Sequence, residues 1–225
     1  MKKRFCGILA IVLFVLPLSV TYAEEGSRGR GRSFSIGAGG FFASDFGGGF
    51  TVTSADAGSG FFGGGTEIES TRTPYMGGGG FLFLDATFAE LSFGFLGGGG
   101  TNLSYSFLGM DIGILGKLPV FINDTITVFP LLGITQRFMV SMSDASGNEI
   151  SNTRDYGSLW FRFGFGMDYS ITDNIFFRSQ ALYGLRRSNR AERNEVDSFA
   201  GDPTVNARAL QGHGLEIRLA LGYRF

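Results

Sequence analysis

The stretch GLEIRLALGYRF, residues 214–225, decides the fold class of this chain. Its odd positions, from Leu215 to Phe225, are large and apolar or aromatic, and its even positions are charged or small. Because successive side chains of a strand point to opposite faces, the pattern predicts a strand with one apolar face and one polar face. A soluble sheet could bury the apolar face in a core, and a transmembrane barrel could turn it toward lipid.

The other end of the chain predicts a secretory signal peptide over residues 1–23. Three basic residues at positions 2–4 precede an apolar run from Ile8 to Leu18, which is too short to span a membrane comfortably. Cleavage after Ala23 removes Cys6, the only cysteine, so the mature chain is expected to have no disulfide and no thiol chemistry. If the chain is the transmembrane barrel, residues 24–32 are expected to form a short leader on the periplasmic side.

The composition favours buried ion pairs over a charged surface. The formal charge of −1 becomes −4 without the three basic residues of the signal peptide, so charge alone does not indicate nucleic acid as a partner. The mature chain has one lysine, Lys117, and fifteen arginines, and arginine is the residue best suited to buried, bidentate pairs with carboxylates. The 37 glycines of the chain lie mostly among phenylalanines and leucines, which argues against disorder.

Eight segments alternate with period 2 and none has a convincing 3.6-residue period, so the mature chain is predicted to be all-β. In the second segment the parity is ambiguous, because Phe81 and Phe83 compete with Leu82 and Leu84. In the fifth, Pro130 cannot donate to a ladder and indicates a soft boundary or a bulge. The segments are residues 33–43, 76–85, 88–97, 103–116, 125–140, 159–171, 175–187 and 214–225.

The connections between these segments differ in length in a regular way. Three are long and polar: residues 44–75, 141–158 and 188–212. Three that alternate with them are short: residues 86–87, 117–124 and 172–174. Only the third connection, near residues 98–102, does not fit, because it is short where the alternation predicts a long loop. Long loops on one side and short turns on the other are typical of an outer-membrane barrel and are not required of a soluble sandwich.

With these features the sequence resembles the small eight-stranded outer-membrane barrels, the group of the OmpA transmembrane domain, OmpX and OmpW. The resemblance implies an antiparallel up-and-down barrel over residues 33–225, integral to the outer membrane of a Gram-negative-type (diderm) bacterium. It also implies that the barrel-assembly machinery reads the last strand. The residues of that assembly signal are Leu219, Leu221, Tyr223 and Phe225.

An eight-stranded barrel is just wide enough for its own side chains to fill, and inward positions of the predicted strands carry both signs of charge. We expect these side chains to pair in the lumen, because an unpaired buried charge is strongly unfavourable. The expected network consists of Glu90, Asp111, Arg137, Arg162, Asp168, Arg178, Arg186, Glu216 and Arg218. Glycines inside strands are expected to leave room for bulky side chains across the lumen.

Little in the sequence indicates chemistry. His213, the only histidine, has Ser188, Asp197 and Glu216 as candidate partners, but LQGHGLE contains no recognisable catalytic motif. No cofactor and no metal are expected, since one histidine without a mature cysteine gives no ligand spacing.

Three functions stay open. The first is a non-enzymatic barrel that serves envelope integrity or surface interaction, with residues 44–75, 141–158 and 188–212 meeting an extracellular ligand or a host surface. The second is a narrow channel or carrier for small or hydrophobic molecules, and the third is a lipid-modifying enzyme. Outer-membrane lipid is an expected partner in each case, and the leader arginines Arg28, Arg30 and Arg32 could contact anionic headgroups.

Overall fold

The computed structural model describes residues 34–54, 66–71, 75–100, 105–121, 125–198 and 205–225. The predicted signal peptide and leader, with Arg28, Arg30 and Arg32, lie outside these residues. So do parts of the loops, and for residues 47–54, 66–71, 121, 195 and 205–210 only the backbone is described.

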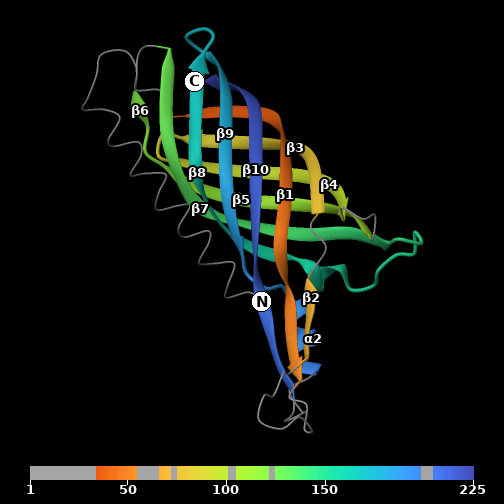
Figure 1. Ribbon diagram of the computed structural model, residues 1–225. Coiled ribbons are helices and arrows are strands. Elements are labelled where there is room, and N and C mark those ends of the chain that lie inside the picture. The colour runs from red at the N-terminus through yellow and green to blue at the C-terminus, as the bar shows by residue number, and fades with distance from the viewer. Residues whose placement is uncertain (1–33, 55–65, 72–74, 101–104, 122–124, 199–204) are drawn as a thin grey trace, which may run out of the picture.

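The protein is an eight-stranded antiparallel β-barrel, which confirms the predicted fold class (Figure 1). Each strand pairs with its neighbour in the chain, and the last closes on the first in a register that runs from Ser35–Arg224 to Ser54–Val205. The barrel strands are β1 (Ser35–Ser54), β3 (Tyr75–Ala86), β4 (Ala89–Gly100), β5 (Tyr105–Lys117), β7 (Ile126–Asp144), β8 (Ser158–Ser170), β9 (Ile175–Arg186) and β10 (Val205–Arg224).

Four smaller elements lie in the described parts of the connections. Two are strands, β2 (Thr66–Thr71), which pairs with the far end of β1, and β6 (Val120–Phe121), which pairs with β7. Two are helices, the 3-10 turn η1 (Thr153–Tyr156) and α2 (Arg190–Ser198). The prediction that the mature chain contains no helix was therefore wrong, because a nine-residue polar segment in a loop is too short to show a clear period.

The barrel has a turn end and a loop end. The C-terminus and the β8–β9 turn lie at the turn end, at the top of Figure 1, and β2 and α2 lie at the loop end below. At the loop end β1 and β10 continue well past the strand ends expected from the sequence, β1 to Ser54 and β10 from Val205. The predicted loops 44–75 and 188–212 are thus partly strand and helix.

The alternation expected from the sequence places apolar side chains outside and polar ones inside. Leu132 and Phe165 are 70% and 73% exposed on the outer face, whereas Arg137 and Arg178 are each 1% exposed. The ambiguous parity of the second segment is resolved, because Phe81 and Phe83 are buried in the lumen and Leu82 and Leu84 face outward. Both faces of β3 are apolar, so its sequence alone could not choose between them.

Pro130 lies inside β7, opposite Phe165 of β8. On the other side of β7, the pairing with β5 ends at Leu131 and the pairing with β6 begins at Val128. Neither β5 nor β6 pairs with Pro130, so its missing N–H is tolerated there. The register shift is elsewhere, between Leu108 and Gly109, and Pro130 is therefore neither a boundary nor a bulge.

The core of the molecule is the barrel interior, where glycines make room for aromatic rings. A Cβ added to Gly166 would lie 2.2 Å from the ring of Phe129, and one added to Gly184 would lie 2.7 Å from the ring of Trp160. These glycines therefore leave room for bulky lumen side chains, as the sequence predicted. Close packing of this kind makes the wall intolerant of even one added methyl group.

Candidate functional site: the ion-pair network of the lumen

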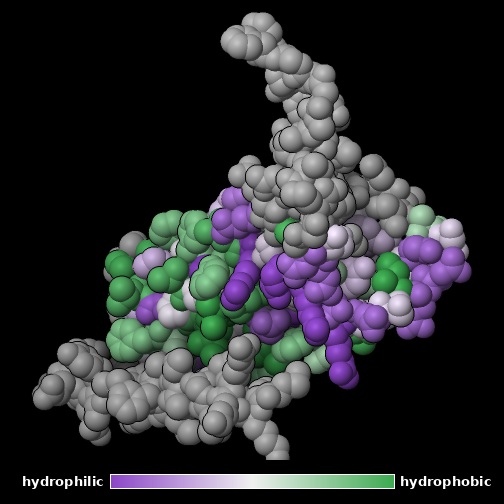
Figure 2. Space-filling model, turned by 90° about the horizontal axis from the view of Figure 1, so that it is seen from below, coloured by the Kyte–Doolittle hydropathy of each residue, from purple (hydrophilic) through white to green (hydrophobic). Residues whose placement is uncertain are grey.

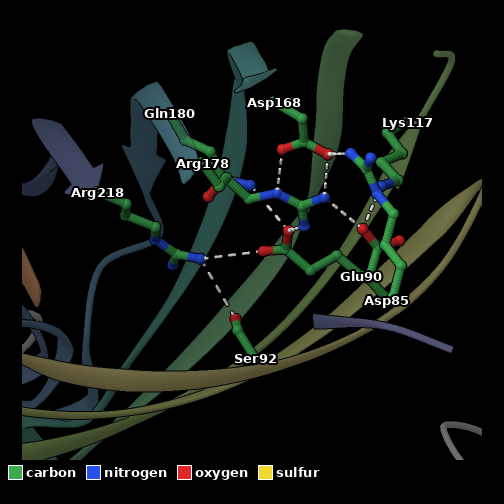
Figure 3. A network of polar contacts seen from close by, with 9 residues as sticks. Asp85, Glu90, Ser92, Lys117, Asp168, Arg178, Gln180 and Arg218 are labelled. Atoms are coloured by element: carbon green, nitrogen blue, oxygen red, sulfur yellow. Dashed lines mark hydrogen bonds and ion pairs between the residues drawn. The ribbon is translucent and has the colours of Figure 1, made fainter. Parts of the chain in front are cut away.

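The turn end of the lumen is organised around one arginine. Arg178 on β9 donates from Nε and Nη2 to the two carboxylate oxygens of Asp168, both at 2.7 Å. Its Nη1 lies 2.7 Å from Oε2 of Glu90, and its Nη2 lies 2.5 Å from Oδ2 of Asp85 (Figure 3). Lys117 also pairs with Asp85. We call these five residues the turn-end cluster.

Strand register brings the turn-end cluster together. Asp168 and Arg178 face each other across β8 and β9, and Asp85 and Glu90 face each other across the tight β3–β4 turn. Two carboxylates at directly opposite positions repel one another unless a cation lies between them. Arg178 reaches across the lumen and supplies that cation, so it links the β8–β9 wall to the β3–β4 wall.

A second group of charges fills the middle of the lumen. Arg218 and Arg162 both pair with Glu216, at 2.5 Å and 2.9 Å. Nη1 of Arg218 also lies 3.6 Å from Oε1 of Glu90, which joins this group to the turn-end cluster. Gln180 donates to the other oxygen of Glu90 at 2.8 Å. The charges thus form a continuous chain from the turn end to mid-lumen.

Trp160 lies between two arginines of the lumen. The guanidinium carbon of Arg162 is 4.6 Å from the centre of an indole ring and that of Arg137 is 5.6 Å away, distances typical of cation–π contacts. Arg137 forms a bidentate pair with Asp111, its neighbour in register, at 2.8 and 2.7 Å, and it also donates to the hydroxyl of Tyr75. The indole ring therefore connects the Arg137 pair to the mid-lumen group.

The loop end holds a separate cluster, in which one partner comes from a loop. Arg186 on β9 donates to both oxygens of Glu192 in α2, at 3.0 and 2.8 Å, and its Nε lies 3.3 Å from Oδ2 of Asp45 on β1. Glu192 and Asn189 also bond reciprocally, since each carries a side-chain oxygen that accepts from the backbone N–H of the other. This is the capping-box arrangement of a helix N-terminus. We call Arg186, Asp45, Glu192 and Asn189 the loop-end cluster.

The structure places all nine residues of the expected network in the interior, each 5% exposed or less, and each with an oppositely charged partner. Sequence reasoning did not include four further members. Asp45 and Lys117 lay just outside the predicted strand limits, and Asp85 belonged to the segment of ambiguous parity. Glu192 carried no usable signal, because it reaches the lumen from a loop.

Comparison with known proteins extends only to structure, since no family model and no curated protein matches the sequence. Neisserial surface protein A (NspA) aligns over 86% of this chain and 97% of its own length, with a TM-score of 0.50 and 10% identity. Two further matches have TM-scores of 0.35. Ail, the attachment invasion locus protein of Yersinia pestis, is 12% identical over 86% of this chain and 99% of its own. OprG from Pseudomonas aeruginosa is 13% identical over 84% of this chain and 97% of its own.

The chain has the fold of the small eight-stranded outer-membrane β-barrels. This likeness rests on architecture alone, because the identities are low. It agrees with the resemblance drawn from the alternating segments and the unequal loops. No helix in the described part of the chain is long and apolar enough to cross a membrane.

The hydrogen bond that the structure shows for His213 joins it to a tyrosine, which was not among the partners considered for it. The imidazole Nδ1 lies 2.6 Å from the hydroxyl of Tyr183 on the outer face. Glu216 lies inside the lumen, 1% exposed, and Asp197 is exposed on α2. Within the described residues no group of three or more His, Cys, Asp or Glu side chains is placed to hold a metal ion.

The four residues of the predicted assembly signal all lie on the outer face of β10 or directly after it. Leu219, Leu221, Tyr223 and Phe225 are 45–63% exposed. The Phe225 ring lies 5.3 Å from that of Tyr223 and 6.3 Å from that of Phe34, and the Phe225 N–H donates to the Phe34 carbonyl. An aromatic group therefore closes the seam between the first and last strands at the turn end.

Proposed function

We propose that the chain is a non-enzymatic barrel of the outer membrane of a diderm bacterium, with a lumen plugged by ion pairs and with its loop end at the cell surface. It would serve envelope integrity or surface interaction through residues 44–75, 141–158 and 188–212. The observation that carries the proposal is the continuous chain of paired charges from Lys117 to Arg162 across a lumen whose other buried side chains are mostly apolar and include many aromatic rings.

The pairing supports a structural role for these charges. Breaking a buried pair by removing one partner leaves an uncompensated charge at a cost of several kcal/mol, so a solute that moved through this lumen would have to open several pairs at once. The barrel wall supports the membrane location, since the outer face is apolar and closure leaves no unpaired strand edge around the barrel.

The loop end supports a role in surface contacts. Hydrophilic side chains gather on the part of this end that Figure 2 shows uncovered, with hydrophobic ones beside them. The β7–β8 connection is ordered by η1 and by a tight hairpin in which Asp144 accepts from the backbone N–H groups of Ser146 and Asn148. Ordered loops on a rigid barrel are where binding residues are expected.

One test combines refolding with conductance. The chain, refolded in detergent, should migrate differently when boiled and unboiled, give a β-type circular dichroism spectrum, and insert into planar bilayers without discrete conductance steps. Steady stepwise conductance from the unmodified chain would contradict the plugged lumen. A band that does not shift, or a chain soluble without detergent, would contradict the membrane barrel itself.

A carrier of small hydrophobic molecules is the second candidate, and one observation favours it. The lumen wall of β1, β3, β4 and β5 is lined by apolar side chains, among them Phe41, Phe81, Leu96 and Phe107. A radiolabelled alkane or fatty acid taken up faster by vesicles that contain the barrel than by empty ones would support this candidate. The same measurement on a Phe107→Arg variant gives the control, since a charge there should abolish uptake.

A further inference from the structure

The outer face of the barrel changes character toward the loop end of β9 and β10. From Phe225 to Leu215, the outward positions of β10 are apolar or aromatic. The next two outward positions of β10 are His213 and Gln211, and the outward position that follows Leu185 is Arg187. Polar side chains thus replace the apolar ones abruptly on two adjacent strands.

The register places these polar side chains together. His213 is directly opposite Leu185, and Arg187 continues the β9 ladder because its backbone N–H donates to the carbonyl of Leu159 on β8 at 2.9 Å. Arg187 and Tyr183 are therefore the two diagonal neighbours of His213 on the same face. The Tyr183 hydroxyl lies 2.6 Å from Nδ1 of His213, which ties two of the three side chains to each other.

Their depth in a bilayer follows from strand length. A barrel strand needs about 9–11 residues to cross the hydrocarbon core. The apolar outward positions run from Leu215 on β10 to Phe225 directly after it, which fills that span. His213 and Arg187 therefore lie just beyond the hydrocarbon, where the headgroups of the loop-end leaflet begin.

At this level of the outer face the described side chains include a positive charge and no negative one. Arg187 is exposed, and within the described part of the chain its guanidinium forms no hydrogen bond or ion pair. The described outward neighbours on β8, β9 and β1 at this height are Leu159, Leu185, Ser44 and Phe46, none of them acidic. The guanidinium fork is thus available to an anion from outside the protein.

The Tyr183–His213 pair adds a hydrogen-bond donor whichever tautomer the histidine adopts. If the hydroxyl donates to Nδ1, then Nε2 carries the remaining imidazole proton. If Nδ1–H donates to the phenol oxygen, the hydroxyl proton is free instead. In both cases one N–H or O–H of the pair is left to donate on the same outer face that carries Arg187.

We propose that Arg187 and the Tyr183–His213 pair bind the phosphate of a lipid headgroup in the leaflet at the loop end. This rests on the membrane location proposed above. The phosphate oxygens accept from the Arg187 fork, a charge-assisted and bidentate contact, and from the donor of the Tyr183–His213 pair. Leu185 and Phe46 meet the upper part of the acyl chains.

The test is native mass spectrometry of the detergent-refolded chain titrated with short-chain phosphatidic acid, with phosphatidylcholine as the neutral comparison. We expect retained phosphatidic acid adducts and few phosphatidylcholine adducts. Arg187→Gln should weaken phosphatidic acid binding about tenfold, the size of one strong charge-assisted hydrogen bond. Arg187→Lys, which keeps the charge and loses the fork, should fall in between.

Two further variants separate this site from general attraction to positive charge. Arg154→Gln removes an exposed arginine of η1 and should leave binding unchanged. The double change of Tyr183→Phe with His213→Leu should weaken binding by a few-fold. Equal binding by the unmodified chain and Arg187→Gln, or an equal loss in Arg154→Gln, would overturn the proposed site.

Competition identifies the source of the phosphate. If inorganic phosphate displaces phosphatidic acid at comparable concentrations, the ligand is a free anion and the lipid assignment is overturned. The same samples are run boiled and unboiled on a gel. An unshifted band means that the barrel itself has failed, whereas a shifted band with no preference for phosphatidic acid refutes only the headgroup site.

Discussion

Arg178 at the turn end and Arg186 at the loop end are both buried on β9, yet their partners come from different kinds of segment. All partners of Arg178 lie on barrel strands, and the register fixes their positions. Arg186 has one partner on a strand, Asp45, and one on a loop helix, Glu192. The turn-end cluster therefore ties the barrel walls together, whereas the loop-end cluster ties a loop to the barrel.

The largest effect is expected at the turn end. Arg178→Met should lower the free energy of unfolding by about 3–5 kcal/mol, because Asp168 and Glu90 keep their charges and lose their shared cation. Urea titration of the refolded chain, followed by fluorescence of Trp160, the only tryptophan, measures this. Arg193→Met, at an exposed position of α2, is the matched control and should change little. A loss under about 1 kcal/mol would mean that the cluster does not hold the walls together.

The next effect concerns packing beside the same cluster. The ring of Phe129 lies against Arg178, with 5.2 Å from the guanidinium carbon to the ring centre, and it fills the space over Gly166. Gly166→Ala should cost about 1–3 kcal/mol, since the added methyl group overlaps the ring. Gly40→Ala is the control, because the atom nearest to a Cβ added at Gly40 is 3.5 Å away. Equal stability of the two variants would show that the ring can move aside.

At the loop end we expect a smaller loss of barrel stability and a larger change in how readily the loop is cleaved. Glu192→Gln removes the negative charge that binds Arg186, but Asp45 still pairs with Arg186 and a glutamine oxygen can still accept from the Asn189 N–H. The free energy of unfolding should fall by no more than about 1 kcal/mol, while trypsin should cleave sooner after Arg190 and Arg193.

Asp197→Asn, in the same helix and exposed, should leave the trypsin cleavage rate as it is. If Glu192→Gln destabilised the barrel as much as Arg178→Met does, the distinction between the two ends would be wrong.

The smallest effect is a pH dependence confined to the β7–β8 hairpin. Hydrogen bonds from the backbone and side chain of Asn148 and from the backbone of Ser146 hold the pKa of Asp144 below its usual value. A lowered pKa in the folded state means that the hairpin is fully stabilised above the ordinary pKa of about 3.9 and loses this contribution as the pH falls through the lowered value.

The amide chemical shift of Asn148, followed by NMR between pH 7 and acid, should therefore titrate with a midpoint below that of a free aspartate. Asp144→Asn should abolish the titration. A midpoint at or above the ordinary value would contradict the hydrogen-bonded turn.

Sequence alone determined where the eight barrel strands lie along the chain, though not their full length, and which face most of the lumen charges occupy. Alternation has period 2, so a residue such as Glu216 or Arg218 inside a regular segment has its face set by its neighbours. The same reasoning failed where both faces of a strand are apolar, and it failed where the alternating pattern ends. Phe81 and Leu82 compete on a strand that is apolar on both faces, and Asp45 lies beyond the last residue that the pattern assigned to its strand.

Only the tertiary structure decided the partners of the buried charges and the role of the loop at the β9–β10 connection. Each lumen arginine could pair with several carboxylates at similar depth, and barrel stagger and side-chain reach select among them. Glu192 is a clear case, since its contact with Arg186 depends on how α2 folds back over the barrel rather than on any local period. Local sequence patterns determine which face a side chain occupies, and the closed barrel determines which side chain it meets there.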